Sequence, residues 1–372
     1  MSNDSEKPKR KPPLRVAGQR IKRGQSYDLR LHFSESYTGV SVSVPVRVIA
    51  APKPGPVVCF TALVHGDELN GLGIIRELFL DNPLELQCGT VIAVPVVNVF
   101  GLENHSRYLP DRRDLNRCFP GTAAGSLTSR LAHKLFNEVI SKADYLVDYH
   151  TAAAGRTNFP NIRGDLSNPD VTELARAFGS SFILDGAGPD GSLRGEAVKA
   201  GIPAIILEAG EIWKIEPGVV ELGVRGGINV LKHYGLLDGD PQTPEFQSVI
   251  RKTTWTRAER GGLLKFFVAP GDLVQKDQLL AVSLDMFGGE QNRLLAPEDG
   301  VILGMSTMPV VRPGDPVFHI AIAPESFGRL ERRMARRKGR GSGLHRRIQR
   351  QLATNILVND AGPTDNSELP KS

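Results

Sequence analysis

The sequence predicts an α/β domain with a mostly parallel or mixed sheet and flanking helices, followed by a smaller all-β domain. Short apolar runs rich in Val and Ile, such as Val57–Leu63 and Thr90–Val97, alternate with amphipathic segments of helical length. This alternation is typical of buried strands covered by helices. Beyond the polar stretch Leu237–Pro244 the chain changes to short strands separated by Gly and Pro, with no helical pattern up to Ala323.

The elements of the α/β domain can be placed in order along the chain. Residues Tyr27–Ala51 alternate polar and apolar side chains around Gly39, which predicts a half-exposed hairpin at the edge of the main sheet. The strands expected after it are Val57–Leu63, Thr90–Val97, Tyr145–His150, Phe182–Asp185 and Ala204–Leu207. The helices expected are Leu69–Leu80, Ser126–Ser141, Asp170–Phe178, Ser192–Ala200 and Pro217–Tyr234. Ligands of such sheets bind beyond the carboxyl ends of the strands.

Composition divides the chain into four parts. Residues 1–26 form a basic arm expected to be disordered, 27–240 the α/β domain, 250–325 the β-rich domain, and 326–372 a basic, largely disordered tail. The β-rich part resembles the barrel-sandwich fold of biotinyl and lipoyl carrier domains, which present a lysine on a hairpin. No lysine lies between Lys276 and Lys338. This argues against a carrier role and favours a role in packing or in shaping access to a site.

Charge is distributed unevenly over the chain, whose net charge is +5. Residues 1–23 hold eight Lys or Arg against two acids, and residues 329–350 hold ten against one, so the part between these ends is acidic. The basic tail could therefore make a weak contact with RNA or another polyanion.

Membrane and disulfide-based classes are not supported by the sequence. No apolar run approaches the length of a membrane span, and the start of the chain lacks the apolar stretch of a signal peptide. The three cysteines are an odd number without CxxC spacing, which argues against a disulfide framework and against a cysteine-ligated metal. We therefore expect a cytoplasmic protein without a membrane partner.

A metal site is predicted by two segments that are far apart in the sequence. The segment VVCFTALVHGDELNG places His65 and Glu68 in the turn after a buried strand, and His150 ends another strand in YLVDYHTA. Because the carboxyl ends of parallel strands meet at one edge of a sheet, we expect these side chains to lie together. Two His and one carboxylate are the ligand set of a catalytic zinc ion, one per chain. Asp67 and Asp148 are nearby carboxylates that could orient the ligand histidines.

The loop between these segments reads NVFGLENHSRYLPDRRDLNRCFPG. A lone HxxE motif is weak evidence, but the chain contains, in order, HGDE, Asn-x-x-Gly, Arg-Tyr, DLNR-x-FPG, DYHT and LEAG. Over residues 27–236 these motifs resemble the succinylglutamate desuccinylase/aspartoacylase family, which is related to zinc carboxypeptidases. The resemblance implies a zinc carboxypeptidase-like fold with zinc on His65, Glu68 and His150.

The same resemblance implies roles for residues of the loop. Arg107, in the Arg-Tyr pair, would polarise the scissile carbonyl. Because the spacer between this arginine and DLNR is longer here than in aspartoacylases, Arg112 or Arg113 could take its place. Asn116 and Arg117 of DLNR would bind a carboxylate of the substrate, for which the planar guanidinium of Arg is well suited.

The general base is predicted at the end of the apolar run IPAIILEAG. A carboxylate there is costly to bury without a partner, so Glu208 should face a cleft, where it can accept a proton. The motif LEAG matches the family's ExG, which also favours Glu208. The alternative base is Glu211.

These residues predict a zinc-dependent hydrolase in which Glu208 activates a metal-bound water. The family resemblance implies that it is a deacylase, which cleaves the amide bond of an N-acyl amino acid or a similar small carboxylate-bearing amide. A carboxypeptidase-like peptidase is the nearest alternative, because the same site would cleave a peptide end. A third hypothesis is a nucleic-acid- or ribosome-associated protein that uses its basic ends. The sequence does not specify the acyl group, the amino acid or the oligomeric state.

Overall fold

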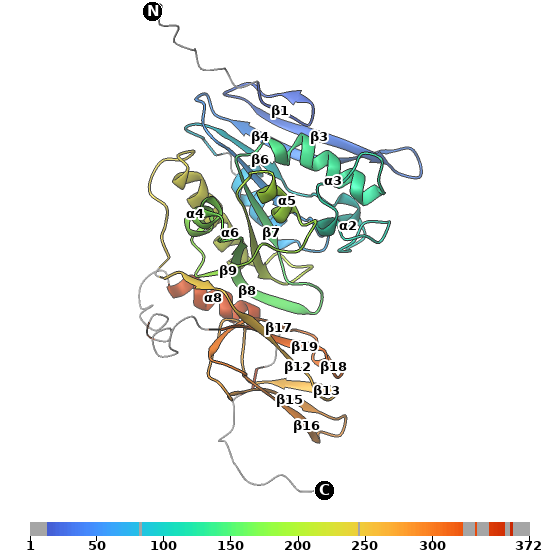
Figure 1. Ribbon diagram of the computed structural model, residues 1–372, viewed down its shortest axis with the longest axis vertical. Helices are drawn as coiled ribbons and strands as arrows, with labels where there is room; N and C mark the ends of the chain where they lie inside the picture. The colour runs from blue at the N-terminus through green and yellow to red at the C-terminus, as the bar shows by residue number, and fades with distance from the viewer. Residues whose placement is uncertain are drawn as a thin grey trace, which may run out of the picture.

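The computed structural model describes residues 13–81, 84–244, 246–322, 332, 342–353 and 358–359. Figure 1 shows helices around one large sheet in the N-terminal part, and β-strands alone in the lower, C-terminal part, with helix α8 between them. The helices are α1 (Asn70–Ile75), continued by a π-helical turn (Arg76–Leu80), α2 (Val99–Glu103), α3 (Leu127–Glu138), α4 (Pro169–Phe178), α5 (Leu193–Lys199), α6 (Pro217–His233) and α8 (Ser342–Ala353), with 3₁₀ turns at Leu115–Arg117 and Ile140–Lys142.

The strands form one large mixed sheet, a second sheet and a short hairpin. They are β1 (Arg15–Val16), β2 (Gln19–Arg20), β3 (Ser26–Glu35), β4 (Ser41–Ala50), β5 (Val57–Ala62), β6 (Thr90–Val94), β7 (Tyr145–His150), β8 (Arg156–Gly164), β9 (Phe182–Asp185), β10 (Ala204–Gly210), β11 (Ser248–Ile250), β12 (Thr253–Arg257), β13 (Gly262–Phe266), β14 (Leu273–Val274), β15 (Leu279–Leu284), β16 (Glu290–Leu295), β17 (Gly300–Ser306), β18 (Val310–Val311) and β19 (Pro316–Ile322).

The main sheet has the strand order β12-β19-β17-β8-β10-β7-β5-β6-β4-β3. Strands β5, β6, β7 and β10 are parallel neighbours in its centre, whereas β3, β4 and β8 join antiparallel. The predicted fold class is confirmed, including the edge hairpin. The carboxyl ends of β5 and β7 lie side by side, which brings the two predicted ligand segments together.

Helices cover both faces of the sheet, as its uninterrupted apolar strands require. On one face Ile74 of α1 and Phe178 of α4 pack in one buried cluster with Val230 of α6. On the other face Leu135 of α3 and Leu193 of α5 belong to a second cluster. This packing holds the central strands rigidly, and with them the residues at their carboxyl ends.

The C-terminal strands are an extension of the main sheet as well as a sandwich of their own. Strand β17 pairs antiparallel with β8, so that β12, β19 and β17 continue the sheet beyond the α/β core. The sheet β16-β15-β13-β18 completes the sandwich, with Phe266 and Phe318 in the core. The sequence did not predict strand β8, because residues 156–164 follow the polar loop after His150. Strand β8 joins the α/β part to the C-terminal β part, because it pairs with β10 on one side and with β17 on the other.

Described segments near both ends of the chain form secondary structure, and most of the tail after residue 322 lies outside the described residues. Residues 1–12 lie outside the described residues, but β1 and β2 form a hairpin within the arm expected to be disordered. Within the tail expected to be largely disordered, helix α8 buries Leu344, Ile348 and Leu352 against the α/β core. Of the described helices, none is long and apolar enough to cross a membrane.

Candidate metal centre and active-site pocket

The turn after β5 brings His65 and Glu68 to the edge of the sheet. Leu63 adopts a left-handed backbone (φ 53°), which turns the chain away from the strand. A Cβ at Gly66 would lie 2.0 Å from the backbone carbon of Gly101, so only glycine fits where the turn passes α2. The glycine of the HGDE motif therefore has a steric role, and it places the residues on either side of it.

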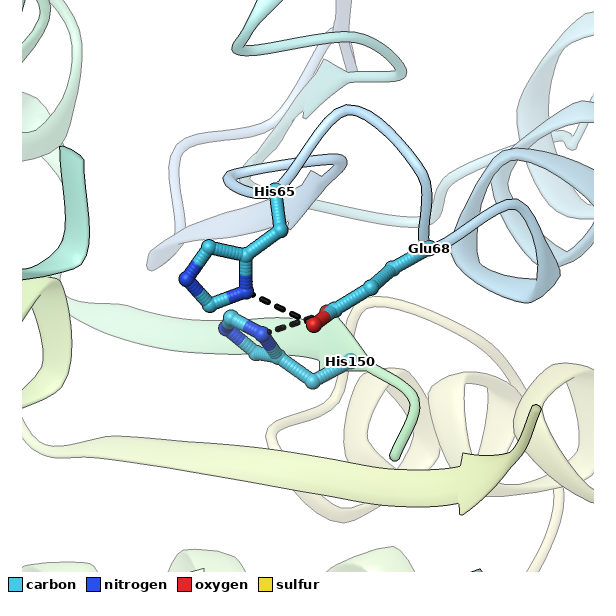
Figure 2. Close-up of side chains that lie close together, drawn as sticks. All are labelled: His65, Glu68 and His150. Carbon is cyan, nitrogen blue, oxygen red and sulfur yellow. Dashed lines mark hydrogen bonds and ion pairs between the residues drawn. The ribbon is translucent and has the colours of Figure 1, made fainter. Parts of the chain in front are cut away.

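Figure 2 shows that the side chains of His65, Glu68 and His150 converge. The Nδ1 atom of His65 lies 2.7 Å from one carboxylate oxygen of Glu68, and Nδ1 of His150 lies 2.8 Å from the other. One ligand atom from each of the three residues lies within 4.8 Å of the others, and the residues are 3%, 1% and 4% exposed. We call these three residues the ligand cluster.

Each histidine of the ligand cluster is oriented by a further carboxylate. His150 donates from Nε2 to Asp148 (2.7 Å), which also accepts a hydrogen bond from the hydroxyl of Thr61. His65 donates from Nε2 to Asp114 (3.1 Å). Such carboxylates fix the ring orientation and leave Nδ1 for an ion. The prediction for Asp148 is confirmed. The prediction for Asp67 is wrong, because Asp114 occupies that place.

The electrostatics of the ligand cluster suit a divalent cation. Burial lowers the pKa of His150, but the carboxylates of Asp148 and Glu68 outweigh burial and hold this pKa well above its usual value. Burial raises the pKa of Glu68, but the two histidines hold it far below its usual range. Metal-bound histidines must be neutral. With both rings neutral, the carboxylates of Glu68, Asp114 and Asp148 outnumber the one guanidinium, that of Arg107, that pairs with them among the described residues, and a divalent ion would balance the excess negative charge.

The ligand cluster lines a cavity of about 590 Å³ whose wall is rich in arginine. Every predicted site residue lines it: His65, Glu68, Arg107, Asn116, Arg117, His150 and Glu208. It is also lined by residues that the sequence did not predict: Asn158, Arg156, Arg163, Arg194, Trp255 and His319. The cavity is therefore larger and more basic than the motifs alone indicate.

Arg107 is the arginine of the loop that reaches the ligand cluster. Its Nη2 lies 2.9 Å from a carboxylate oxygen of Asp114, and its Nη1 lies 3.4 Å from Glu68. These carboxylates outweigh burial and raise the pKa of Arg107, so it remains charged. The alternatives Arg112 and Arg113 are exposed and do not line the cavity.

Three further polar residues line the cavity: Asn116, Arg117 and Arg194. The side-chain oxygen of Asn116 accepts a hydrogen bond from the backbone N–H of Leu193 (2.8 Å), so its amide nitrogen is the group left to bind a ligand. Arg117 is exposed and donates to the carbonyl of Asn116. Arg194 is buried, and its Nη1 has no hydrogen-bond partner among the described residues. Burial lowers the pKa of Arg194 to about 10.

Glu208 is beside His150 in the sheet, since the two residues pair across β10 and β7. Asn158 donates to one carboxylate oxygen of Glu208 (2.9 Å), and Arg163 lies 3.9 Å from the other. The alternative base Glu211 forms an ion pair with Lys214 and accepts a hydrogen bond from Thr307, and it does not line the cavity.

Comparisons with known proteins identify relatives of this chain. Residues 54–234 match the model of the succinylglutamate desuccinylase/aspartoacylase catalytic domain. The chain is 29% identical over 302 residues to the N-alpha-acetyl-L-2,4-diaminobutyric acid deacetylase of Halomonas elongata. The matched region covers 77% of this chain and 88% of the relative.

Solved structures show the same fold. A succinylglutamate desuccinylase/aspartoacylase from Rhodobacter sphaeroides is 27% identical, with a TM-score of 0.72 over 82% of this chain and 98% of the other. The product-bound ectoine utilization protein EutE (DoeB) from Ruegeria pomeroyi is 24% identical, with a TM-score of 0.73 over 81% of this chain and 97% of the other.

The fold, the site and these matches define a hydrolytic deacylase. Residues 54–234 form a catalytic domain of the succinylglutamate desuccinylase/aspartoacylase type, as the motifs predict.

Proposed function

We propose that the chain hydrolyses the amide bond of an N-acyl amino acid and that it does so with one zinc ion on His65, Glu68 and His150. The observation that carries the proposal is the ligand cluster, in which two oriented imidazoles and a carboxylate converge in a large basic cavity. Support for the substrate class comes from the Halomonas elongata relative, whose name describes a deacetylase of an N-acetylated amino acid.

The residues of the ligand cluster fit zinc in ligand type and number. When bound there, zinc would supply an electropositive centre that polarises the amide carbonyl and makes a water molecule more acidic. The contribution of the chain is orientation, because Asp114 and Asp148 fix the two rings before any ion arrives.

Glu208 is the proposed general base. It takes a proton from the attacking water and returns it to the leaving amine, which departs neutral as the C–N bond breaks. Asn158 holds one oxygen of Glu208 and leaves the other directed at the cavity near Arg163. Glu211 is already engaged by Lys214 and Thr307, so it is not available for this step.

Arg107 is the proposed stabiliser of the negative charge that develops on the carbonyl oxygen. The carboxylate of Asp114 accepts hydrogen bonds from its Nε and Nη2, so the guanidinium is held in place before the substrate binds. A donor that is fixed in advance needs no reorganisation during the reaction, which is why such donors contribute strongly to rate.

Asn116 and Arg117 are the proposed ligands of the substrate carboxylate, and the structure adds Arg194 as a third candidate. The buried guanidinium of Arg194 has an Nη1 without a partner among the described residues, and it lines the same cavity. A carboxylate placed there would restore the missing acceptor, which makes the interaction strong.

A substrate panel tests the proposal. Zinc-loaded protein, protein stripped with a chelator and protein restored with zinc are each given N-acyl amino acids and short peptides, and release of free amine is measured. We expect release from N-acyl amino acids only when zinc is present. Faster release from peptide carboxyl ends would support the carboxypeptidase-like alternative, and no release from any compound would refute both activities.

A further inference from the structure

A second, smaller pocket lies behind strand β8, on the face opposite the cavity of the ligand cluster. Successive side chains of a strand point to opposite faces of its sheet. Asn158 of β8 lines the cavity of the ligand cluster, whereas the next residue, Phe159, packs against helix α8, which Figure 1 shows beside β8. The pocket has a volume of about 220 Å³, and we call it the α8 pocket. The residues that define it are Phe159, Ser180, Leu222, Arg225, Leu344 and Ile348.

The apolar part of the α8 pocket comes from three elements. Phe159 belongs to β8, Leu222 to α6, and Leu344 and Ile348 to α8, and all four pack in one hydrophobic cluster. A closed apolar cavity of about 150 Å³ holds a molecule as large as benzene. By the same proportion, the α8 pocket has room for a ligand of roughly seven to nine non-hydrogen atoms.

Arg225 of α6 brings a cation to this apolar pocket. The residue is half-buried, and no hydrogen bond or ion pair joins it to any part of the chain that the structure describes. Glu221, one turn earlier on the same helix, is placed to pair with Arg225, but its carboxylate is paired with Arg347 of α8. Burial lowers the pKa of Arg225, yet a guanidinium remains charged at neutral pH. A half-buried guanidinium without an acid partner is suited to bind an anion.

Ser180 adds a hydroxyl group to the same pocket. It follows Gly179, whose left-handed backbone ends helix α4, and it is 1% exposed. Its Oγ is buried and has no hydrogen-bond partner among the described residues. A buried donor without an acceptor lowers stability, so a ligand oxygen that accepts from Ser180 would recover this loss.

We propose that the α8 pocket binds a small monocarboxylate with an apolar chain, about the size of valerate. The carboxylate accepts hydrogen bonds from Arg225 and Ser180, and the chain lies among the apolar side chains of β8, α6 and α8. The ligand therefore holds α8 against the core. The inference goes beyond the proposed function, because no described residue lines both this pocket and the cavity of the ligand cluster.

Calorimetry with three probes tests the chemistry of the pocket. The cavity of the ligand cluster also contains arginines, so binding is assigned to the α8 pocket only where Arg225→Gln abolishes it. We expect such binding for valerate, about 10- to 100-fold tighter than for the neutral valeramide, the usual value of one charge-assisted hydrogen bond. Inorganic phosphate, which has charge without an apolar chain, should bind more weakly than valerate. Valerate binding that is the same in Arg225→Gln would overturn the proposal, as would phosphate binding as tight as that of valerate.

Two further variants make the assignment specific. Ser180→Ala should weaken valerate binding by about 2- to 10-fold, because it removes one neutral hydrogen bond. Arg176→Gln is the matched control, since Arg176 is exposed on α4 and does not line the α8 pocket, and it should bind valerate normally. A loss of valerate binding in Arg176→Gln as large as in Arg225→Gln would contradict the proposal.

Thermal unfolding separates a ligand site from a merely structural arginine, and it needs no turnover. Without ligand, Arg225→Gln should have the same Tm as the unmodified protein or a higher one, because it removes a half-buried charge that has no partner. Valerate should raise the Tm of the unmodified protein with increasing concentration and leave that of Arg225→Gln unchanged. A lower Tm of Arg225→Gln without ligand, together with no effect of valerate on the unmodified protein, would give Arg225 a structural role only and refute the proposal.

Discussion

Two walls of one cavity contain buried histidines, and His150 on one wall and His319 on the other have opposite electrostatic surroundings. His150 in the ligand cluster lies between the carboxylates of Asp148 and Glu68, which hold its pKa well above the usual value. His319 lies in the part of the cavity formed by Arg156, Trp255 and His319, which we call the basic wall. Burial, with the nearby cations of Arg163 and Arg156, lowers the pKa of His319 to about 4. Both residues are imidazoles of similar burial, so the charges of the neighbours account for the difference.

The comparison shows that the two walls of the cavity carry charges of opposite sign. The ligand cluster has an excess of carboxylate and is suited to a cation, whereas the basic wall carries the guanidinium of Arg156 over the ring of Trp255. The following substitutions test this difference in charge between the two walls, from the largest expected effect to the smallest.

Removal of either ligand histidine should have the largest effect. His65→Ala or His150→Ala leaves two protein ligands, which rarely hold zinc at cellular concentrations, so zinc content and amide hydrolysis should both fall to background. His319→Gln, which changes the other buried histidine of the cavity, should keep its zinc. The measurement is elemental analysis after gel filtration, and full zinc occupancy in either alanine variant would contradict the site.

Removal of the cation beside the ligand cluster should have the next largest effect. Arg107→Gln should lower kcat by about 100- to 1,000-fold, the usual loss for one donor to a developing oxyanion, while zinc remains bound. Arg113→Gln, in the same loop but exposed and outside the cavity, is the matched control and should be close to normal. If Arg113→Gln lowered kcat as much as Arg107→Gln, the role that the family resemblance implies would have been given to the wrong arginine.

The basic wall should make the protein sensitive to acid. The folded state keeps His319 neutral until about pH 4, while the unfolded chain protonates it near pH 6.5, so the unfolded state binds more protons between these values. The contribution of neutral His319 to the free energy of unfolding is fully present above pH 6.5. It declines as the pH falls from 6.5 to about 4, by roughly 3 kcal/mol in total.

His319→Gln should therefore lose less stability than the unmodified protein between pH 7 and pH 4.5. Denaturant unfolding with a chelator present measures this difference without a contribution from bound metal. Parallel declines in the two proteins would show that His319 is not held neutral.

The smallest effect on activity should come from helix α8, none of whose residues lines the cavity. Ile348 is 1% exposed, so Ile348→Ala should lower the free energy of unfolding by about 2 kcal/mol, at the lower end for buried residues because a surface helix can shift to fill the space. Arg350→Ala, on the exposed side of the helix, is the control. Urea unfolding measures the change, and kcat/KM should remain within about twofold in both variants. A large loss of kcat/KM in Ile348→Ala would show that α8 supports the cavity.

The ligand cluster could be predicted because each of its two segments is recognisable from a short stretch of sequence. His65 and Glu68 lie in one turn, His150 ends a recognisable buried strand, and parallel strands place their carboxyl ends together. The same reasoning identified Asp148, two residues from His150 on the same strand. It did not identify Asp114, because a loop residue gives no periodic signal and only the folded loop places its carboxylate beside His65.

The basic wall could not be predicted in the same way. Trp255 and His319 lie about a hundred residues or more beyond His150, and they reach the cavity only because β17 pairs with β8. Strand β8 was itself missed. Helix α8 was also missed, because its arginines dominate the composition and conceal the spacing of Leu344, Ile348 and Leu352 on one face.

The most direct test of the account is the zinc content and turnover of Glu208→Gln, measured beside Glu211→Gln. Glutamine keeps the volume of Glu208 and removes the proton acceptor, so zinc should stay bound while kcat falls by about 10²- to 10⁴-fold with little change in KM. Glu211→Gln should be mild, since Glu211 is outside the cavity. Loss of zinc from Glu208→Gln would make Glu208 a metal ligand, and a normal kcat with a defective Glu211→Gln would move the base to Glu211; either result would contradict the account.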